Sequence, residues 1–266
     1  MISRSLSVTD SWTVVFWRSV FAALFLFGFM VWRDGLGGTF TKIKSMGRWS
    51  FAVALCFAIA SSSFVISLAY TTVANVLLIQ AGVPLIAALL TRILFHEKIS
   101  RATWVATAAV IVGVAIMVSE SFTGNVSPIG DSLAILIAFV FATATVITRR
   151  HSDVQMTPAV CIAVIIAASF AFTMTGGLAV STWDFGLLVA FGALNLGLGL
   201  ALFVIGARNV PAALAALIGT IEPVLAPLWV WLVHHEVPSN RTLIGGAVVF
   251  VALLMYLLLD WRRQRR

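Results

Sequence analysis

Nine apolar stretches fill most of this chain, and they constrain its fold more than any other feature. Each is about 20 residues long, which is the length of an α-helix that crosses a hydrocarbon core of about 30 Å. The connections between the stretches are short and leave no room for a soluble domain. The sequence therefore predicts an all-α membrane protein of nine transmembrane helices, near residues 12–33, 49–68, 73–95, 101–119, 129–150, 156–179, 183–206, 211–234 and 240–261.

The charges are few, and they are unevenly distributed. Of the 266 residues, 61% are hydrophobic and only 10% are charged, which is too little polar surface for a soluble globule. A net charge of +7 would suggest a nucleic-acid partner in a soluble protein. Here, however, most of the basic residues lie in alternate loops and in the C-terminal tail, so we expect no nucleic-acid partner. These residues are Arg33, Lys42, Lys44, Arg48, Arg92, Lys98, Arg101, Arg149, Arg150, Arg208, Arg262, Arg263, Arg265 and Arg266.

This charge pattern predicts an orientation. Loops rich in lysine and arginine stay on the cytoplasmic side of a membrane. The chain should therefore be a multi-pass protein of the cytoplasmic (inner) membrane, with its N-terminus outside and its C-terminus in the cytoplasm. Residues 262–266 then form a basic cytoplasmic tail that lies at the lipid headgroups.

One polar phrase occurs twice in the chain. Residues 95–100 read FHEKIS and residues 234–239 read HHEVPS. In the same frame, Pro84 matches Pro223 and Thr103 matches Thr242. An odd number of predicted helices separates the two phrases, so they should face opposite sides of the membrane. Repeats of opposite orientation are typical of alternating-access transporters.

The matched prolines predict interruptions in two helices. Pro84 and Pro223 each lie about a dozen residues into an apolar stretch, near the bilayer midplane at 1.5 Å per residue. A proline has no N–H and clashes with the carbonyl four residues earlier, and Pro227 repeats the effect one turn after Pro223. Free carbonyls at membrane depth are tolerated only against protein or a water-filled cavity. These helix breaks therefore suggest a central cavity, and a packing kink is the alternative.

Two segments carry a resemblance to a known family. Residues 74–100, ANVLLIQAGVPLIAALLTRILFHEKIS, and residues 212–239, AALAALIGTIEPVLAPLWVWLVHHEVPS, resemble the two EamA-type repeats of the drug/metabolite transporter superfamily. Arg18, in VVFWRSVFAALFL, resembles the arginine near the start of the family's second helix. The resemblance covers nearly the whole chain. It implies a ten-helix fold of two inverted five-helix bundles that moves small metabolites across the cytoplasmic membrane.

The first repeat departs from that pattern. Residues 1–122 hold four predicted helices, whereas residues 129–261 hold five. The helix at 129–150 opens the second repeat, and its counterpart in the first repeat would lie before Met1. We therefore expect the first repeat to lack its first helix. A start further upstream, or a truncation, is favoured over a nine-helix variant with a gap in its cavity wall.

Four polar residues are candidates for contact with a solute or a coupling ion. All six aspartates lie in loops or at helix ends, and Glu222 is the one acidic residue near the midplane. An ionised group there costs about 2.5–3.5 kcal/mol on insertion scales, which marks Glu222 as a functional candidate. Its alternative is a hydrogen-bonded glutamate that supports the proline break. Gln80, Asn195 and Asn75 are the amide candidates, and each could instead form an interhelical hydrogen bond.

Other chemistries have little support in the sequence. His234, His235 and Glu236 are adjacent, so their side chains point in different directions on a helix and do not form a metal-ligand pattern. We expect no metal, no cofactor and no catalytic residues. Cys56 and Cys161 lie in apolar stretches and are interpreted as small packing residues.

The favoured function is a secondary transporter that moves a small metabolite by alternating access. Its solute would be an amino acid, vitamin, nucleoside or drug-like molecule. Its other expected partner is the lipid bilayer that surrounds it. The lone deep acid, Glu222, is compatible with a cationic solute, a proton-coupled neutral solute or facilitated exchange. A non-transporting scaffold or sensor, or an inactive truncated paralogue, is the alternative, and an intramembrane enzyme is less favoured because no histidine or aspartate lies at depth.

Overall fold

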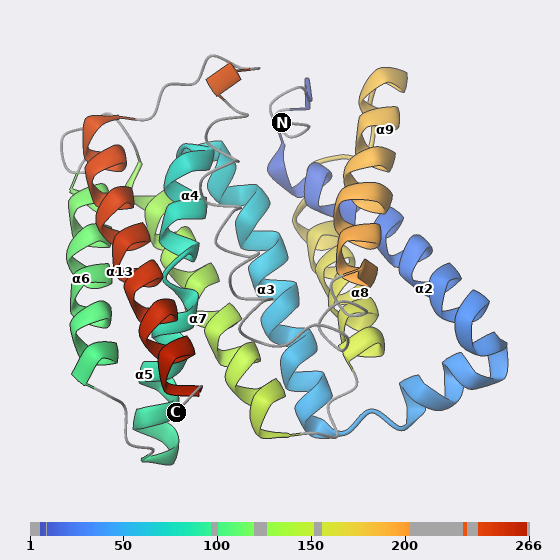
Figure 1. The fold of residues 1–266 in the computed structure, drawn as a ribbon. Helices are drawn as coiled ribbons and strands as arrows, with labels where there is room; N and C mark the ends of the chain where they lie inside the picture. Colours follow the sequence, from blue (N-terminus) through green and yellow to red (C-terminus); the bar gives the residue numbers. More distant parts are fainter. Residues whose placement is uncertain are drawn as a thin grey trace. The chain divides into compact units, whose positions relative to one another are not determined.

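The computed structural model describes residues 6–8, 10–96, 101–119, 127–151, 156–202, 231–232 and 239–264. Within these ranges the regular elements are helices and no strand is present, which confirms the all-α prediction there (Figure 1). The elements are α2 (Ser11–Lys44), α3 (Arg48–Tyr70), α4 (Val73–Gln80), α5 (Val83–Phe95), α6 (Arg101–Val118), α7 (Pro128–Arg150), α8 (Met156–Met174), α9 (Thr182–Val189), the π-helix η2 (Ala190–Leu198) and α13 (Asn240–Gln264).

Six helical segments in the described residues are long and apolar enough to cross a membrane. They are α2, α3, α7, α8, the pair α4 and α5 taken together as Val73–Phe95, and the continuous segment Thr182–Leu202. Helices α6 and α13 contain shorter apolar segments, Trp104–Val118 and Asn240–Tyr256. These elements coincide with eight of the predicted stretches, whereas 211–234 lies outside the described residues apart from 231–232. The chain is therefore a multi-pass membrane protein.

The first helix is longer than the sequence analysis expects. The prediction ends at Arg33, whereas α2 continues to Lys44 across a kink at Gly35, which has φ 71° and ψ 168°. Glycine adopts this left-handed φ without the steric cost of a side chain. At the kink, the Asp34 carboxylate pairs with Arg33 at 2.8 Å and with Lys42 at 2.7 Å. The Asp34–Lys42 ion pair spans the kink and joins the two segments. Lys42 and Lys44, which the sequence analysis assigns to a loop, therefore lie on a helix.

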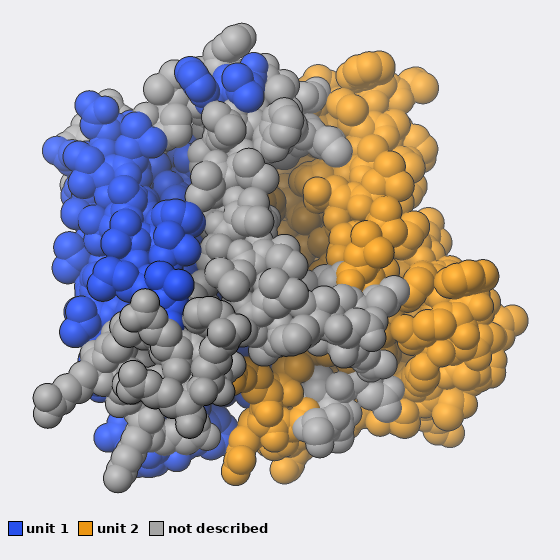
Figure 2. Space-filling model, viewed as in Figure 1, with its two compact units in different colours: residues 1, 67–146, 210–266 blue, residues 2–66, 147–209 orange. Residues whose placement is uncertain are grey.

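The chain divides into two compact units, which are coloured in Figure 2. Unit 1 comprises Ser67–Val146 and Val210–Arg266 together with Met1, and unit 2 comprises Ile2–Ile66 and Ile147–Asn209. Each unit therefore combines segments from both halves of the sequence.

In unit 1, close glycine contacts hold α6 against α13, and the two helices lie side by side in Figure 1. A Cβ atom on Gly113 would lie 2.7 Å from the carbonyl oxygen of Gly245, and a Cβ on Gly245 would contact the carbonyl oxygen of Gly113. Small residues at helix interfaces let backbones approach closely in membranes, where dispersion forces contribute much of the association. These two glycines therefore determine how closely α6 and α13 pack.

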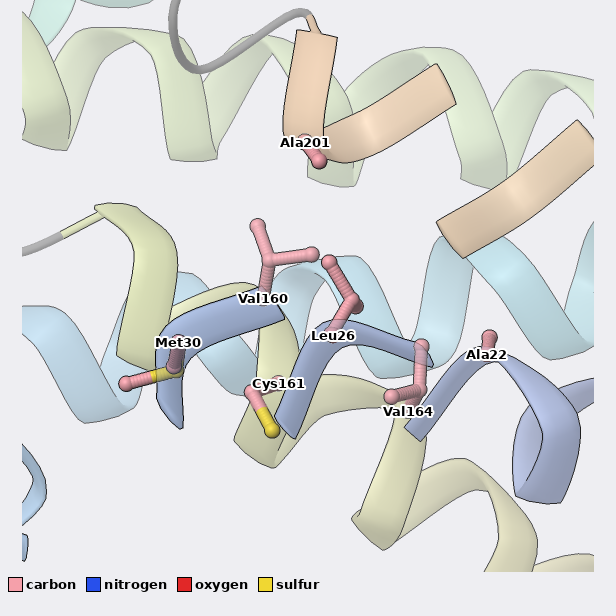
Figure 3. Packing of buried hydrophobic residues seen from close by; sticks show 7 residues of the cluster. All are labelled: Ala22, Leu26, Met30, Val160, Cys161, Val164 and Ala201. Atoms are coloured by element: carbon pink, nitrogen blue, oxygen red, sulfur yellow. The ribbon is translucent and has the colours of Figure 1, made fainter. Parts of the chain in front are cut away.

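In unit 2, the core lies between α2 and α8. Figure 3 shows the buried residues of α2 and α8 together with Ala201, which lies beyond η2. The α2 residues recur at every fourth position, so they form one face of the helix. The cluster is Ala22, Leu26, Met30, Val160, Cys161, Val164 and Ala201. Both cysteines of the chain are free thiols, and Cys161 is a packing residue in this cluster.

Replacing Gly245 by alanine should destabilise the protein because the new methyl group would meet backbone, which has little room to move. We expect a loss of about 1–3 kcal/mol, which is typical of overpacking. Gly28→Ala is the matched control, since nothing lies within 4 Å of a Cβ at this helical position. Thermal unfolding of the purified variants in detergent measures both effects. Equal midpoints for Gly245→Ala and Gly28→Ala would contradict the close contact between α6 and α13.

Candidate functional site

A buried hydrogen-bond network surrounds Asn75 in unit 1. Asn75 and Asp131 are each only 1% exposed. The Asn75 Nδ2 donates to the Asp131 Oδ1 at 2.9 Å, and the Asn75 Oδ1 accepts from the Thr242 hydroxyl at 2.7 Å. The Thr71 hydroxyl also donates to Asp131, at 3.0 Å. The network therefore links the beginnings of α4, α7 and α13.

Local sequence signals place these groups together. Thr72 caps α4, since its hydroxyl accepts from the Asn75 backbone N–H at 3.2 Å. Ser239 caps α13 by accepting from the Thr242 N–H at 3.1 Å. Gly130 lies so close to Thr71 that a Cβ there would be 2.7 Å from the threonine Cβ. Caps and glycine thus bring the helix starts close enough for their side chains to bond.

The network occupies the polar atoms of Asn75 with protein partners. Its amide nitrogen has carboxylate and hydroxyl acceptors, and its amide oxygen has a hydroxyl donor. This geometry favours the interhelical alternative for Asn75, although its contact with a solute stays a prediction. Sequence reasoning did not select Asp131 as a network member, because a carboxylate in the first turn of a helix is usually a solvated cap.

The α4–α5 segment contains a different kind of site. Helix α4 ends at Gln80, α5 begins at Val83, and Pro84 lies in the first turn of α5. Proline supplies no N–H, so the carbonyl of Gln80 lacks the donor that would continue the helix. The Gln80 side chain is half-buried, and its Nε2 is a buried donor without a partner in the described residues. Gln80 thus offers unused hydrogen-bonding groups beside a helix interruption.

Unit 2 contains a buried arginine, Arg18, which is 5% exposed. Its Nη1 donates to the backbone carbonyl of Ser61 at 3.4 Å, which is a long hydrogen bond. Its Nε is buried and has no partner in the described residues. The guanidinium lies 4.6 Å from the ring centre of Phe191 and 5.8 Å from that of Phe64. Aromatic faces therefore provide most of its stabilisation.

Phe191 belongs to η2, the π-helix that follows α9. Residues 190–198 form this segment, which replaces part of the expected regular span. Single-turn π segments inside α-helices occur frequently at functional sites. Asn195, a sequence candidate, lies in η2 and is exposed rather than buried. Asn195 belongs to unit 2, whereas Gln80 and Asn75 belong to unit 1.

Two acidic residues of unit 2 accept hydrogen bonds at helix starts, Asp10 as the cap of α2 and Asp184 in the first turn of α9. Asp10 caps α2, and its carboxylate accepts from the Thr13 hydroxyl at 2.7 Å and the Thr175 hydroxyl at 3.0 Å. Burial acts to raise the pKa of Asp10, but these bonds and those from the Trp12 and Thr13 N–H groups lower it below its ordinary value. Asp184 is buried and accepts hydrogen bonds from Ser7 and Ser181. These carboxylates stabilise helix ends.

The remaining sequence candidates lie outside the described residues. They are Glu222, Pro223 and Pro227, and the same is true of His234, His235 and Glu236. Among the side chains that the structure does describe, no group of three histidine, cysteine, aspartate or glutamate residues could hold a metal ion.

Thr242→Val should destabilise unit 1, because it keeps the side-chain shape but removes the hydroxyl that donates to Asn75. A buried amide oxygen would lose its partner, at a cost of about 1–3 kcal/mol. Thr143→Val is the matched control, since Thr143 is only half-buried on α7 and its hydroxyl donates to the Phe139 carbonyl of its own helix. The unfolding midpoints of both valine variants are measured in detergent. Equal midpoints would contradict a stabilising role of the network.

Comparison with known proteins identifies relatives of the chain. The model of the EamA-like transporter family matches residues 1–119 and again residues 128–258. An uncharacterized transporter from Synechocystis sp. is 24% identical, over 74% of this chain and 61% of its own length. The chain thus spans about three-fifths of that relative.

A solved crystal structure has the same fold. It superposes with a TM-score of 0.63 at 16% identity, over 96% of this chain and 90% of the other. The resemblance inferred from the two repeated segments and Arg18 is confirmed by the family match. Because that match covers nearly the whole sequence, the chain belongs to the EamA-like transporter family, within the drug/metabolite transporter superfamily.

Proposed function

We propose that this protein is a secondary transporter that moves a small metabolite across the cytoplasmic membrane by alternating access. The observation that carries the proposal is the double match of one transporter family to residues 1–119 and 128–258. Two copies of one membrane module in a chain can expose a shared site alternately to each side when one moves against the other.

The helix interruption at Pro84 supports a solute-binding role for this part of unit 1. Unsatisfied backbone at membrane depth is expected only where it faces protein or a water-filled cavity. The free amide of Gln80 lies at the same position along the chain. A solute with hydrogen-bonding groups would satisfy both, and would then stabilise the conformation that binds it.

The proposed architecture has nine transmembrane helices in two inverted repeats, 1–122 and 129–261. The eight apolar segments of the described residues and the apolar stretch 211–234 make up this number. The alternation of basic loops places the N-terminus outside and the C-terminus in the cytoplasm. Five of the basic residues that carry this assignment lie in the last turns of α2, α5 and α7, namely Lys42, Lys44, Arg92, Arg149 and Arg150.

The proposed solutes are amino acids, vitamins, nucleosides or drug-like molecules. Glu222 is the proposed site of proton coupling or of recognition of a positive charge. Acidic side chains near the membrane midplane commonly serve as proton relays in pumps and transporters. Gln80, Asn195 and Asn75 are the proposed amide contacts, with Gln80 the best supported because its donor is free.

The proposal is tested by transport into vesicles that contain the purified chain. Radiolabelled amino acids, nucleosides and vitamins are offered with and without an imposed proton gradient. We expect accumulation of at least one solute above the level of protein-free vesicles. If Glu222 carries a proton, Glu222→Gln should abolish accumulation driven by the gradient but retain exchange, and if it binds a cationic solute, both should fail.

Glu97→Gln is the matched control, because Glu97 lies in a predicted loop. It should transport as the parent chain does. Absence of accumulation for every solute would contradict the transporter proposal and favour a scaffold or sensor. An unchanged pH profile and an unchanged solute preference in Glu222→Gln would leave Glu222 with a structural role.

The orientation is tested by single cysteines in a chain whose Cys56 and Cys161 have been replaced. Cysteines at Lys44 and Arg150 should react with a membrane-impermeant maleimide from the cytoplasmic side only, because both positions belong to basic loops or helix ends. A cysteine at Thr123 should react from the outside only. Labelling of Thr123 and Arg150 from the same side would overturn the inverted arrangement, since one predicted helix separates them.

A further inference from the structure

Arg18 has an unusual environment for a charged group at membrane depth. It lies about 10 Å along α2 from the helix start at 1.5 Å per residue. Burying an unpaired charge is expensive, and such groups in membrane proteins are usually paired or functional. Within the described residues Arg18 has one long hydrogen bond, to the Ser61 carbonyl, and no carboxylate partner. Its charge is therefore not balanced by the described part of the chain.

The two aromatic rings leave one part of the guanidinium free. Phe191 and Phe64 interact with it as cation–π partners, which involve the face of each ring. The Nη1 donates to Ser61, whereas the Nε makes no hydrogen bond. The Nε and Nη2 hydrogens form a planar pair that matches the two oxygens of a carboxylate. Because the Nε has no partner in the described residues, this edge of the guanidinium has unmet hydrogen-bonding capacity that an oxyanion would fill.

The backbone around Arg18 keeps η2 close to α2. A Cβ atom on Gly192 would collide with the carbonyl oxygen of Arg18 and lie 2.7 Å from the Cβ of Phe21. Only glycine allows this approach, and the next residue towards the N-terminus is Phe191. The π-helical segment therefore presents an aromatic ring to the guanidinium at 4.6 Å. An irregular helix, a glycine contact and an unpaired buried cation thus occur at one place.

We propose that Arg18 binds the carboxylate group of the transported solute, which makes the solute an organic carboxylate. The bound carboxylate would balance the buried charge and accept from the unpaired Nε–H, while Phe191 and Phe64 fix the plane of the guanidinium. That the bound carboxylate is carried across the membrane rests on the proposed transport function. The binding of a carboxylate by Arg18 is testable without any transport measurement.

The test uses the purified full chain in detergent and measures the shift of its thermal unfolding midpoint with ligand concentration. Benzoate is the probe because it joins a carboxylate to a small apolar body. Benzamide is its uncharged counterpart, and inorganic phosphate is a non-planar anion. Benzoate should raise the midpoint of the parent chain, whereas benzamide and phosphate should not.

Three variants assign the effect to the guanidinium. Arg18→Gln should bind benzoate about tenfold more weakly or worse, because it loses a charge-assisted pair. Arg18→Lys keeps the charge but lacks the planar fork, so its benzoate affinity should lie between those of the parent and Arg18→Gln. This variant also keeps the test usable if Arg18→Gln fails to fold. Arg48→Gln is the matched control, since Arg48 is exposed at the start of α3. It should bind benzoate as the parent does.

Equal benzoate affinity in the parent and in Arg18→Lys would overturn the inference, as would stabilisation by benzamide or phosphate equal to that by benzoate. A parent chain that benzoate does not stabilise would overturn it too. Vesicle uptake that is unaffected by Arg18 substitution, together with Arg18-independent binding, would leave the transporter proposal standing and remove this one. Arg18-dependent benzoate binding without uptake of any solute would support carboxylate binding by Arg18 and contradict the transporter proposal.

Discussion

The fold depends on one constraint: inside a hydrocarbon layer, the protein must satisfy its own polar groups. Helices satisfy most of the backbone, but each helix start leaves several N–H groups without an internal partner. In this chain Asp10, Thr72, Ser181 and Ser239 cap helix starts, and the network of Asn75 and Asp131 joins the starts of α4, α7 and α13 in unit 1. Stability at the helix starts therefore comes from short-range hydrogen bonding rather than from large cores.

Among the described residues, the buried side-chain atoms without a hydrogen-bond partner are Arg18 Nε, Ser19 Oγ, Ser61 Oγ and Gln80 Nε2, and two of them lie beside irregular backbone. The free donor of Gln80 precedes the Ala81–Gly82 interruption, and the free donor of Arg18 lies against the π-helix η2. A rigid, fully satisfied bundle would have no hydrogen bonds left for a solute. Unsatisfied groups beside irregular helices provide both recognition and a place for conformational change. This combination, in a chain of a transporter family, is the physical basis of the proposed function.

Apolar length was sufficient to predict the helices of the described residues, because a bilayer imposes its thickness on the sequence. The continuation of α2 beyond Gly35 was not predicted, since the apolar stretch ends at Arg33 and the Asp34–Lys42 ion pair spans the kink only in the folded helix. The role of Asp131 and the π-helix around Phe191 also depend on contacts between distant segments. In helices that are apolar on all sides, periodicity does not identify which face lies inside the protein. Family resemblance therefore singled out Arg18, but the sequence did not show which aromatic residues surround it.

Alternating access makes one requirement that a static membrane protein does not meet: the same residue must be reachable from each side in turn. A single cysteine at Gln80, in a chain without Cys56 and Cys161, measures this directly when an impermeant maleimide is applied to right-side-out and to inverted vesicles. The account predicts labelling from both sides, with the ratio between them changed by an imposed proton gradient. Labelling from one side only under every condition, or from neither side, would contradict it.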